Sequence, residues 1–185
     1  MKKTNKTKES ILIQEIKNGN QQAFKELVES LQTSVATTAV NMLGNQEEAE
    51  DIGQEVFIQI YRSINTFKGE ASIKTWAIRI TINLCLNAIK KRNKKRWLSL
   101  SIFEGKEKSL GQEEQTFKAY EIKDSVDQAL QKLEPKFKTV VILRLIEGYS
   151  VKETAEILNL PSGTVLSRLA RAQKKLKIDL EKTWK

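Results

Sequence analysis

The sequence predicts an all-α protein made of two small helical domains joined by a flexible linker. Few residues oppose helices, since the chain has two prolines and eight glycines among its 185 residues. Apolar residues recur three or four positions apart along most of the chain, and no convincing pair of alternating strands is present. From Trp97 to about Phe117 this periodicity fades and Ser, Gly, Lys and Glu dominate, as is typical of a linker.

The N-terminal part begins with helix signals at Ile11, followed by two helices with clear start and stop residues. Asn20 can cap a helix that Gly44 ends. Asn45 can cap the next helix, which should end near Ile64 and has acidic side chains in its first turn, where the helix dipole favours them.

That next helix has two distinguishable faces. Its inner face is apolar and consists of Ala49, Ile52, Gly53, Val56 and Ile60. Another face carries Asp51, Glu55, Ile58 and Arg62, with Gln54 beside it. An exposed isoleucine among charged residues suits a protein contact with an apolar centre and a charged rim, and a merely solvated face is the alternative.

A loop over residues 65–71 precedes a third, long helix, which Ser72 can cap and which ends in a basic run over residues 90–96. Apolar residues surround much of its axis, so it is expected to pack on more than one side. A polar ridge with a four-residue repeat nevertheless runs along it beside Trp76, formed by Thr75, Arg79, Asn83 and Asn87. Such a ridge can bind unpaired bases, but it can also be a partly exposed edge beside a core tryptophan.

Helical periodicity returns near Tyr120, in the second expected domain. Pro135 suits the first turn of a helix over residues 136–147, which Gly148 should end. Two further helices follow it. The expected organisation is therefore a domain over residues 8–96, a linker over 97–119 and a domain over 120–182.

The clearest motif lies at residues 150–176 and predicts a helix-turn-helix. Ser150 can cap its first helix, residues 159–161 interrupt that helix, and Ser162 can cap the second. The second helix has a narrow apolar stripe formed by Val165, Leu169, Ala172 and Leu176, and its other side carries Thr164, Ser167, Arg168, Arg171 and Lys175. Such a helix can enter a major groove, while the amides at its start can hold a phosphate. A helical hairpin with a solvated basic face is the alternative.

The net charge of +9 is unevenly distributed along the chain. Residues 1–96 carry 16 basic and 10 acidic side chains, residues 97–135 carry 5 and 8, and residues 136–185 carry 11 and 5. Two basic blocks separated by an acidic one suggest two modules that face nucleic acid. Ordinary solvated lysines account for the charge alone equally well.

Several function classes are excluded by composition. The chain has no histidine and a single cysteine, which removes internal disulfides, the commonest zinc sites and histidine-based nucleophilic catalysis. Cys85 lies in an apolar run and is expected to be a small buried side chain. The carboxylates of residues 47–51 lie on different faces of one helix, so metal-dependent nucleic-acid chemistry is not favoured. No catalytic residue, metal, other cofactor or small-molecule substrate is expected.

No apolar stretch is long enough to span a membrane, and the polar N-terminus lacks the apolar core of a secretory signal. A cytoplasmic location is therefore expected.

Taken together, three blocks of the sequence resemble the extracytoplasmic-function group of sigma-70 family sigma factors. Residues 48–57 (EAEDIGQEVF) look like region 2.2, and residues 67–76 (FKGEASIKTW), continuing to Asn83, look like regions 2.3 and 2.4. Residues 143–150 and 161–169 (PSGTVLSRL) look like region 4. Response-regulator DNA-binding domains share the last block, so a helix-turn-helix transcriptional regulator that does not bind polymerase is the alternative function.

The resemblance implies a sigma factor that binds core RNA polymerase and directs promoter recognition, with a region 2 helical bundle and a region 4 helix-turn-helix. The residues implied in docking on the clamp helices of the largest polymerase subunit are Asp51, Gln54, Glu55 and Phe57, with Ile58 added from its expected exposure. Those implied at the −10 element, where the DNA is opened and a base is captured, are Phe67, Lys68, Gly69, Ser72, Lys74, Thr75, Trp76, Arg79, Asn83 and Asn87. Those implied at the −35 duplex are Ser162, Gly163, Thr164, Ser167, Arg168, Arg171 and Lys175.

The implied partners are core RNA polymerase, promoter DNA and an anti-sigma factor, which is often membrane-bound in this group. The acidic linker is similar to the family's segment that threads the RNA exit path. Two positions depart from the pattern, because Leu166 stands where a polar or basic residue is common and Ala170 where histidine is common.

Overall fold

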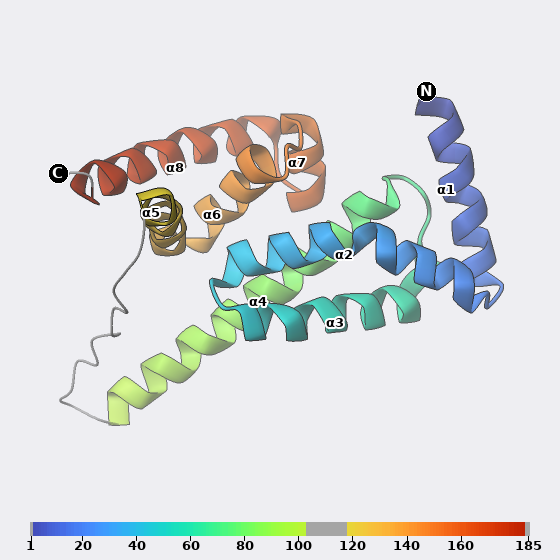
Figure 1. The fold of residues 1–185 in the computed structure, drawn as a ribbon, viewed down its shortest axis with the longest axis horizontal. Coiled ribbons are helices and arrows are strands. Elements are labelled where there is room, and N and C mark those ends of the chain that lie inside the picture. Colours follow the sequence, from blue (N-terminus) through green and yellow to red (C-terminus); the bar gives the residue numbers. More distant parts are fainter. Residues whose placement is uncertain (1, 103–117, 184–185) are drawn as a thin grey trace.

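The computed structural model describes residues 2–102 and 118–183. Within these ranges all regular secondary structure is helical, and there is no β-strand (Figure 1). The all-α prediction is therefore confirmed. The N-terminal lobe contains α1 (Lys2–Lys17), α2 (Gln21–Leu43), α3 (Gln46–Ser63), the short 3-10 helix η1 (Ile64–Thr66) and α4 (Ile73–Ile102). The C-terminal lobe contains α5 (Lys118–Lys132), α6 (Pro135–Val141), the π-helical turn η2 (Ile142–Ile146), α7 (Val151–Leu158) and α8 (Ser162–Thr183). Residues 103–117, most of the predicted linker, lie outside the described residues.

Helix starts and stops follow the capping residues. The side-chain oxygen of Asn20 accepts hydrogen bonds from the amides of Gln22 and Ala23 at 2.9 and 3.1 Å, so it caps α2. Gly44 ends α2 in the left-handed conformation with φ 68°, where a side chain would be strained. The side-chain oxygen of Asn45 accepts from the amide of Glu48 at 2.7 Å and caps α3. These local predictions are confirmed.

Three helix boundaries differ from the sequence pattern. Helix α4 continues through Trp97 to Ile102, past its basic run. The predicted helix over residues 136–147 is an α-helix only to Val141, and a π-helical turn completes it before Gly148. Ser162 is the first residue of α8 rather than its cap, because the carbonyl of Pro161 accepts the first helical hydrogen bonds.

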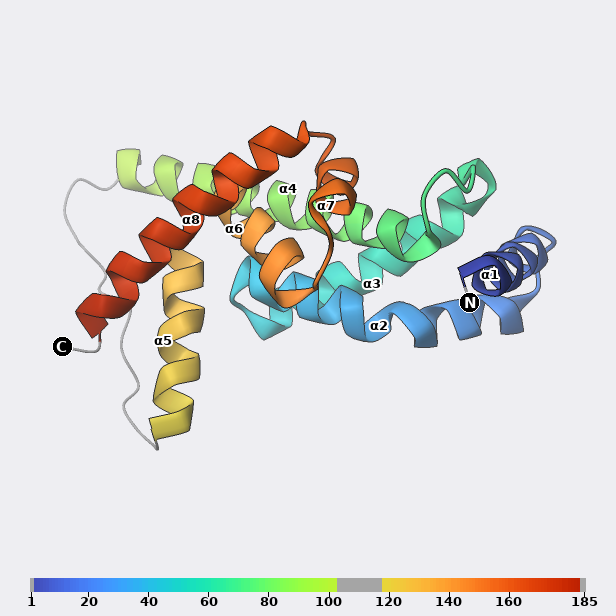
Figure 2. The ribbon, with the colours of Figure 1, turned by 90° about the horizontal axis from the view of Figure 1, so that it is seen from above.

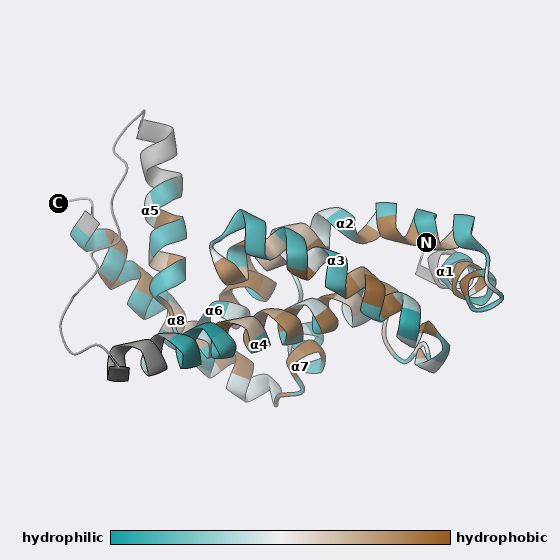
Figure 3. Cartoon of the chain, turned by 90° about the horizontal axis from the view of Figure 1, so that it is seen from below, coloured by the Kyte–Doolittle hydropathy of each residue, from teal (hydrophilic) through white to brown (hydrophobic). Residues whose placement is uncertain are grey.

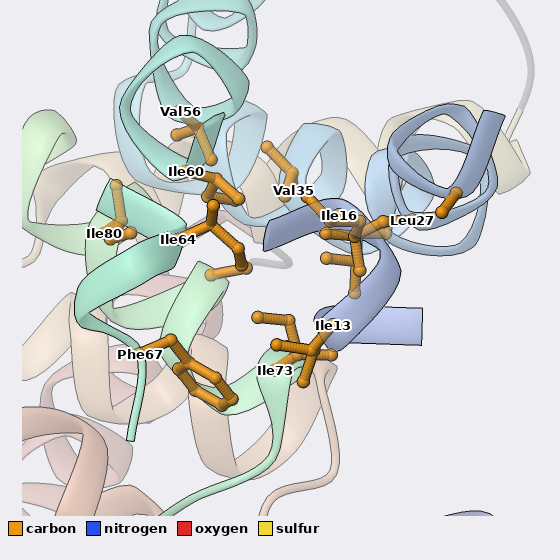
Figure 4. Packing of buried hydrophobic residues seen from close by; sticks show 13 residues of the cluster. Ile13, Ile16, Leu27, Val35, Val56, Ile60, Ile64, Phe67, Ile73 and Ile80 are labelled. Atoms are coloured by element: carbon orange, nitrogen blue, oxygen red, sulfur yellow. The ribbon is translucent and has the colours of Figure 1, made fainter. Parts of the chain in front are cut away.

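Helices α2, α3 and α4 form the bundle of the N-terminal lobe, and α1 packs across one end of it (Figures 1 and 2). The core of this end contains thirteen buried residues, including Leu27, Val35, Val56 and Ile60. Figure 4 shows Leu27 beside Ile16 and Val56 beside Ile60. The predicted inner face of α3 is thus confirmed. In the described part of the chain, no helix is long and apolar enough to cross a membrane.

The two lobes pack directly against each other along α4 and the C-terminal half of α2 (Figure 2). One hydrophobic cluster joins Met42 and Cys85 to Leu133, Phe137 and Ile142. Another joins buried residues of both lobes, namely Ile78, Ile82, Leu143, Tyr149 and Ile157. Figure 3 shows that α4 is hydrophobic along its middle and hydrophilic toward its C-terminal basic run. The prediction that α4 packs on more than one side is confirmed, as is the burial of Cys85.

Candidate nucleic-acid interface

Helix α8 presents one face to its lobe and the other to solvent. Val165 and Ala172 are buried, and Leu169 and Leu176 are half-buried, so the predicted apolar stripe is confirmed. The preceding helix α7 is held by a capping box, in which the Ser150 hydroxyl accepts from the Glu153 amide and the Glu153 carboxylate accepts from the Ser150 amide. A left-handed residue, Asn159, ends α7 with φ 51° and begins the tight connection to α8.

The solvent face of α8 carries most of the residues predicted to contact duplex DNA. Ser162, Gly163, Ser167, Arg171 and Lys175 are exposed, and Thr164 and Arg168 are half-buried. Hydroxyl and guanidinium groups on one exposed helix face can contact phosphates and base edges in a major groove.

Lys175 already has an intramolecular partner. Its ammonium group lies 2.7 Å from the carboxylate of Glu134, which also binds Lys136 at 2.8 Å, and 4.8 Å from the centre of the Phe137 ring. The hydrogen bonds from Lys136 and Lys175 lower the pKa of Glu134 to about 2. Lys175 would therefore have to leave Glu134 in order to bind a phosphate.

The loop between η1 and α4 forms a second candidate site, an open pocket of about 360 Å³. Its walls are residues 66–71 on one side and Trp76, Arg79 and Glu156 on the other. The rings of Phe67 and Trp76 are 5.1 Å apart, and Gly69 adopts φ 72° at the turn of the loop. Aromatic and basic groups around a small open pocket are suited to a single unstacked base.

Two residues predicted to contact DNA near this pocket are not accessible. Phe67 is only 8% exposed because its ring packs into the core of the lobe. Thr75 is 6% exposed and its hydroxyl lies 2.9 Å from that of Ser72 in the first turn of α4. Thr75 is therefore the buried end of the polar ridge, because the first turn of α4 faces the core at this position. Lys68, Gly69, Ser72, Lys74, Asn83 and Asn87 are exposed, and Trp76 and Arg79 are half-buried.

Arg79 is held by the C-terminal lobe. Its guanidinium donates a 2.6 Å hydrogen bond to the main-chain oxygen of Glu156 in α7. Lys74 lies 5.9 Å from the centre of the Tyr149 ring, which also belongs to the C-terminal lobe. The polar ridge of α4 is therefore partly covered by α7, a placement that the sequence pattern did not predict.

The outer face of α3 is a third candidate site. Asp51, Gln54 and Glu55 are exposed, and Ile58 is 43% exposed, as the sequence pattern predicted. Phe57 is half-buried and packs against the core of the lobe, so it supports this face from beneath. The sequence interpretation missed Tyr61, which is 54% exposed and contacts the Phe24 ring at 5.0 Å. Its position three residues after Ile58 on the same helix was the available signal.

Polar contacts between the lobes concentrate at the C-terminal end of α2. The main-chain oxygens of Asn41 and Met42 accept hydrogen bonds from the side chains of Gln131 and Lys138, at 2.9 and 3.2 Å. These carbonyls have no partner within α2, so the second lobe satisfies them. Lys138 also donates to the Gln131 side-chain oxygen at 2.6 Å and is only 4% exposed. Burial, together with the nearby charge of Arg92, lowers the pKa of Lys138 to about 8.

Raising the pH from about 8 to about 10 should therefore increase the free energy of unfolding through Lys138. In the unfolded chain Lys138 is exposed and has its ordinary pKa of 10.5. Between pH 8 and pH 10 the unfolded chain therefore binds more protons than the folded chain, so the free energy of unfolding rises with pH. Above pH 10 the burial of Tyr149, whose pKa is raised to about 12, acts in the opposite direction. Urea unfolding at several pH values measures the slope.

The variant Lys138→Met should flatten that slope, and the exposed Lys152→Met is the matched control that should keep it. An equal slope in all three proteins would show that Lys138 is not the titrating group.

Comparison with known proteins identifies two matching family regions. Residues 27–95 match "Sigma-70 region 2", and residues 123–176 match "Sigma-70, region 4". The ECF RNA polymerase sigma factor SigW of Bacillus subtilis is 32% identical over 176 residues, covering 91% of this chain and 94% of that protein. The RNA polymerase sigma-H factor of Pseudomonas aeruginosa is 32% identical over 170 residues, covering 88% of each.

Two solved structures share the fold. The sigma factor RpoE in complex with the anti-sigma factor NepR from Bartonella quintana has a TM-score of 0.68 and 21% identity, covering 85% of this chain and 96% of that one. CnrH in complex with the cytosolic domain of CnrY also has a TM-score of 0.68, with 24% identity and coverage of 94% and 97%. The region 2 match separates this chain from regulators that share only the helix-turn-helix.

Proposed function

The chain belongs to the sigma-70 family, in its extracytoplasmic-function group, and from this premise we propose how its two lobes divide promoter recognition. As a sigma factor it binds core RNA polymerase and promoter DNA in transcription initiation and is not itself an enzyme. We assign the −10 element and polymerase docking to residues 8–96, the −35 element to residues 120–182, and the connection to residues 97–119. The observation that carries the proposal is the order of the two family regions on two lobes, each with an exposed basic surface.

The outer face of α3 is the surface that docks on core polymerase. Asp51, Gln54 and Glu55 supply charged and polar contacts around the exposed Ile58 and Tyr61. An apolar centre with a charged rim is the usual composition of a protein interface.

Recognition of the opened −10 element falls to the pocket beside residues 66–71. A base that leaves the stack costs a few kcal/mol, which the pocket offsets by stacking on Trp76 and by hydrogen bonds from the loop. Lys68, Lys74 and the basic run that ends in Arg96 hold the phosphates, so binding falls as salt concentration rises.

Recognition of the −35 element falls to α8, whose exposed face enters the major groove. Arg168 and Arg171 suit guanine edges or phosphates, and the first amides of the helix suit a phosphate.

The packed arrangement of the lobes cannot engage both elements at once. Arg79, at the pocket assigned to the −10 element, donates a hydrogen bond to Glu156 of α7. Glu156 is six residues before the start of α8, so at most about 22 Å of chain separates the two. The −10 and −35 elements are about 25 base pairs apart, which is about 85 Å of duplex. The lobes therefore separate when the protein assembles with polymerase on a promoter, and the contacts that the released C-terminal lobe makes with the −35 duplex and polymerase offset the loss of the contacts between the lobes.

An anti-sigma factor is the further partner we propose. In one of the solved structures described above, the sigma factor RpoE is bound to the anti-sigma factor NepR. A protein that binds the packed form in preference to the open form shifts the population away from promoter recognition.

Run-off transcription with core polymerase on a promoter library tests the proposed function. Addition of the protein should select a defined set of start sites that share −10 and −35 sequences. If core polymerase that is active with another sigma factor gains no start-site selection, the proposed function is wrong.

The variant Arg168→Ala should lower transcription from the selected promoter by about tenfold to a hundredfold, because an arginine–guanine contact is worth about 1–3 kcal/mol. The thermal unfolding midpoint should change little, since Arg168 is only half-buried. Lys182→Ala, at the far end of the same helix, is the control. Unchanged transcription in Arg168→Ala would remove this residue from the −35 contact.

A further inference from the structure

Helix α1 contacts both ends of the loop that forms the −10 pocket. We propose that Glu9 and Lys17 of α1 are positioning residues, which fix this loop in the shape that captures the unstacked base. The inference rests on the proposed function of the loop. The region 2 match begins at residue 27, so α1 lies outside the matched family region.

The two contacts are hydrogen bonds between residues far apart in the sequence. The Lys17 ammonium donates to the main-chain oxygen of Phe67 at 3.0 Å, where the loop begins. The Glu9 carboxylate accepts from the main-chain amide of Ile73 at 2.9 Å, where the loop ends and α4 begins. A carboxylate at the start of a helix also interacts favourably with the helix dipole. Both ends of the loop are thus attached to the same helix.

Glu9, Ile13 and Lys17 follow one another at intervals of four residues, so they lie on one face of α1. Ile13 is buried in the core cluster that also contains Phe67 and Ile73, and Figure 4 shows these three side chains close together. The face that α1 turns toward the loop is therefore apolar at its centre with a polar group on either side. This arrangement determines where Phe67 and Ile73 lie relative to each other.

The shape of the pocket depends on the relative positions of Phe67 and Ile73, because its two walls come from opposite sides of the loop. Residues 66–71 form one wall, and Trp76 and Arg79 of α4 help to form the other. The loop has no regular secondary structure and turns at Gly69, so its own main chain does little to define its shape. Phe67, whose carbonyl Lys17 holds, places its ring against Trp76 at 5.1 Å.

The test uses the full chain with core polymerase on a promoter chosen by run-off selection, and measures permanganate reactivity of thymines in the −10 element. Lys17→Met and Glu9→Ala should each lower reactivity by about fivefold, the size expected for one hydrogen bond. Lys17→Arg and Glu9→Gln keep a donor and an acceptor and should restore most of it. Lys25→Met and Glu29→Ala, an exposed pair on α2, are matched controls that should open the promoter as the unchanged protein does.

Core affinity and binding to −35 duplex should stay within about twofold in all variants, which separates positioning from a general loss of structure. The inference is overturned if Lys17→Met and Glu9→Ala open the −10 element normally. It is also overturned if opening, core affinity and duplex binding fall together and the conservative variants restore none of them. If the unchanged protein itself opens no promoter, the proposed function fails and the inference with it.

Discussion

A disulfide that joins the two lobes should abolish promoter-directed transcription, and its reduction should restore it. The cysteines belong at positions 44 and 131, as Gly44→Cys and Gln131→Cys. A Cβ atom built on Gly44 lies 2.8 Å from the Cγ atom of Gln131, so the two cysteines can reach the Cβ–Cβ separation of about 3.5–4.5 Å that a disulfide requires. With the lobes joined, α8 and the −10 pocket cannot span the distance between the two promoter elements, and activity should fall to that of core polymerase alone.

The native cysteine should not interfere with this bond. Cys85 is fully buried, and burial raises its thiol pKa to about 12, so it carries almost no reactive thiolate near neutral pH. Gly44→Cys alone is the control for the strain that a side chain introduces at the left-handed position of Gly44. Gln131→Cys alone is the control for the loss of the hydrogen bonds that the Gln131 side chain makes with Asn41 and Lys138. Intact transcription by the oxidised double variant, with the disulfide verified by mass spectrometry, would show that the lobes need not separate.

Removing the charges of Asp51 and Glu55 together should weaken the affinity for core polymerase by about a hundredfold. Hydrogen bonds to charged groups contribute about 1.5–3 kcal/mol each, and about 1.4 kcal/mol corresponds to a factor of ten. Both side chains are exposed on α3, so the variant Asp51→Ala with Glu55→Ala should fold normally. Titration of labelled core polymerase with the protein gives the dissociation constant.

The matched control removes two charges from the same helix. Glu47→Ala with Glu50→Ala changes the net charge equally, and both residues are exposed near the start of α3. This control should retain affinity within about threefold, because exposed charges away from the contact contribute little. Equal losses in both double variants would indicate a general effect of charge and remove the docking assignment from Asp51 and Glu55.

Both predictions depend on the balance between the free energy that keeps the lobes packed together and the free energy of binding to polymerase and promoter DNA. The packed form is stabilised by shared hydrophobic clusters and by donors from Gln131 and Lys138 on the last carbonyls of α2. Docking through α3 leaves these contacts untouched, so polymerase can bind the N-terminal lobe before the C-terminal lobe is released. The disulfide should therefore block transcription without removing core binding, whereas the Asp51 and Glu55 variant should lose both.

Features that depend on neighbouring residues were predictable from the sequence. The caps at Asn20, Asn45 and Ser150 each involve hydrogen bonds to amides two or three residues away, so residue type and spacing determine them. The apolar stripe of α8 likewise follows from helical periodicity. The same rule did not predict the burial of Thr75, because periodicity groups residues on a face without saying what covers that face.

The sequence by itself therefore determined the helices, their order and the two family regions that make this chain a sigma factor. Only the tertiary structure decided that the lobes pack together, that α7 accepts a hydrogen bond from Arg79, and that α1 makes hydrogen bonds to both ends of the loop between η1 and α4. The physical reason is that these contacts join residues 50 to 77 positions apart. Their pairing depends on how whole helices pack, which residue spacing along one helix does not specify.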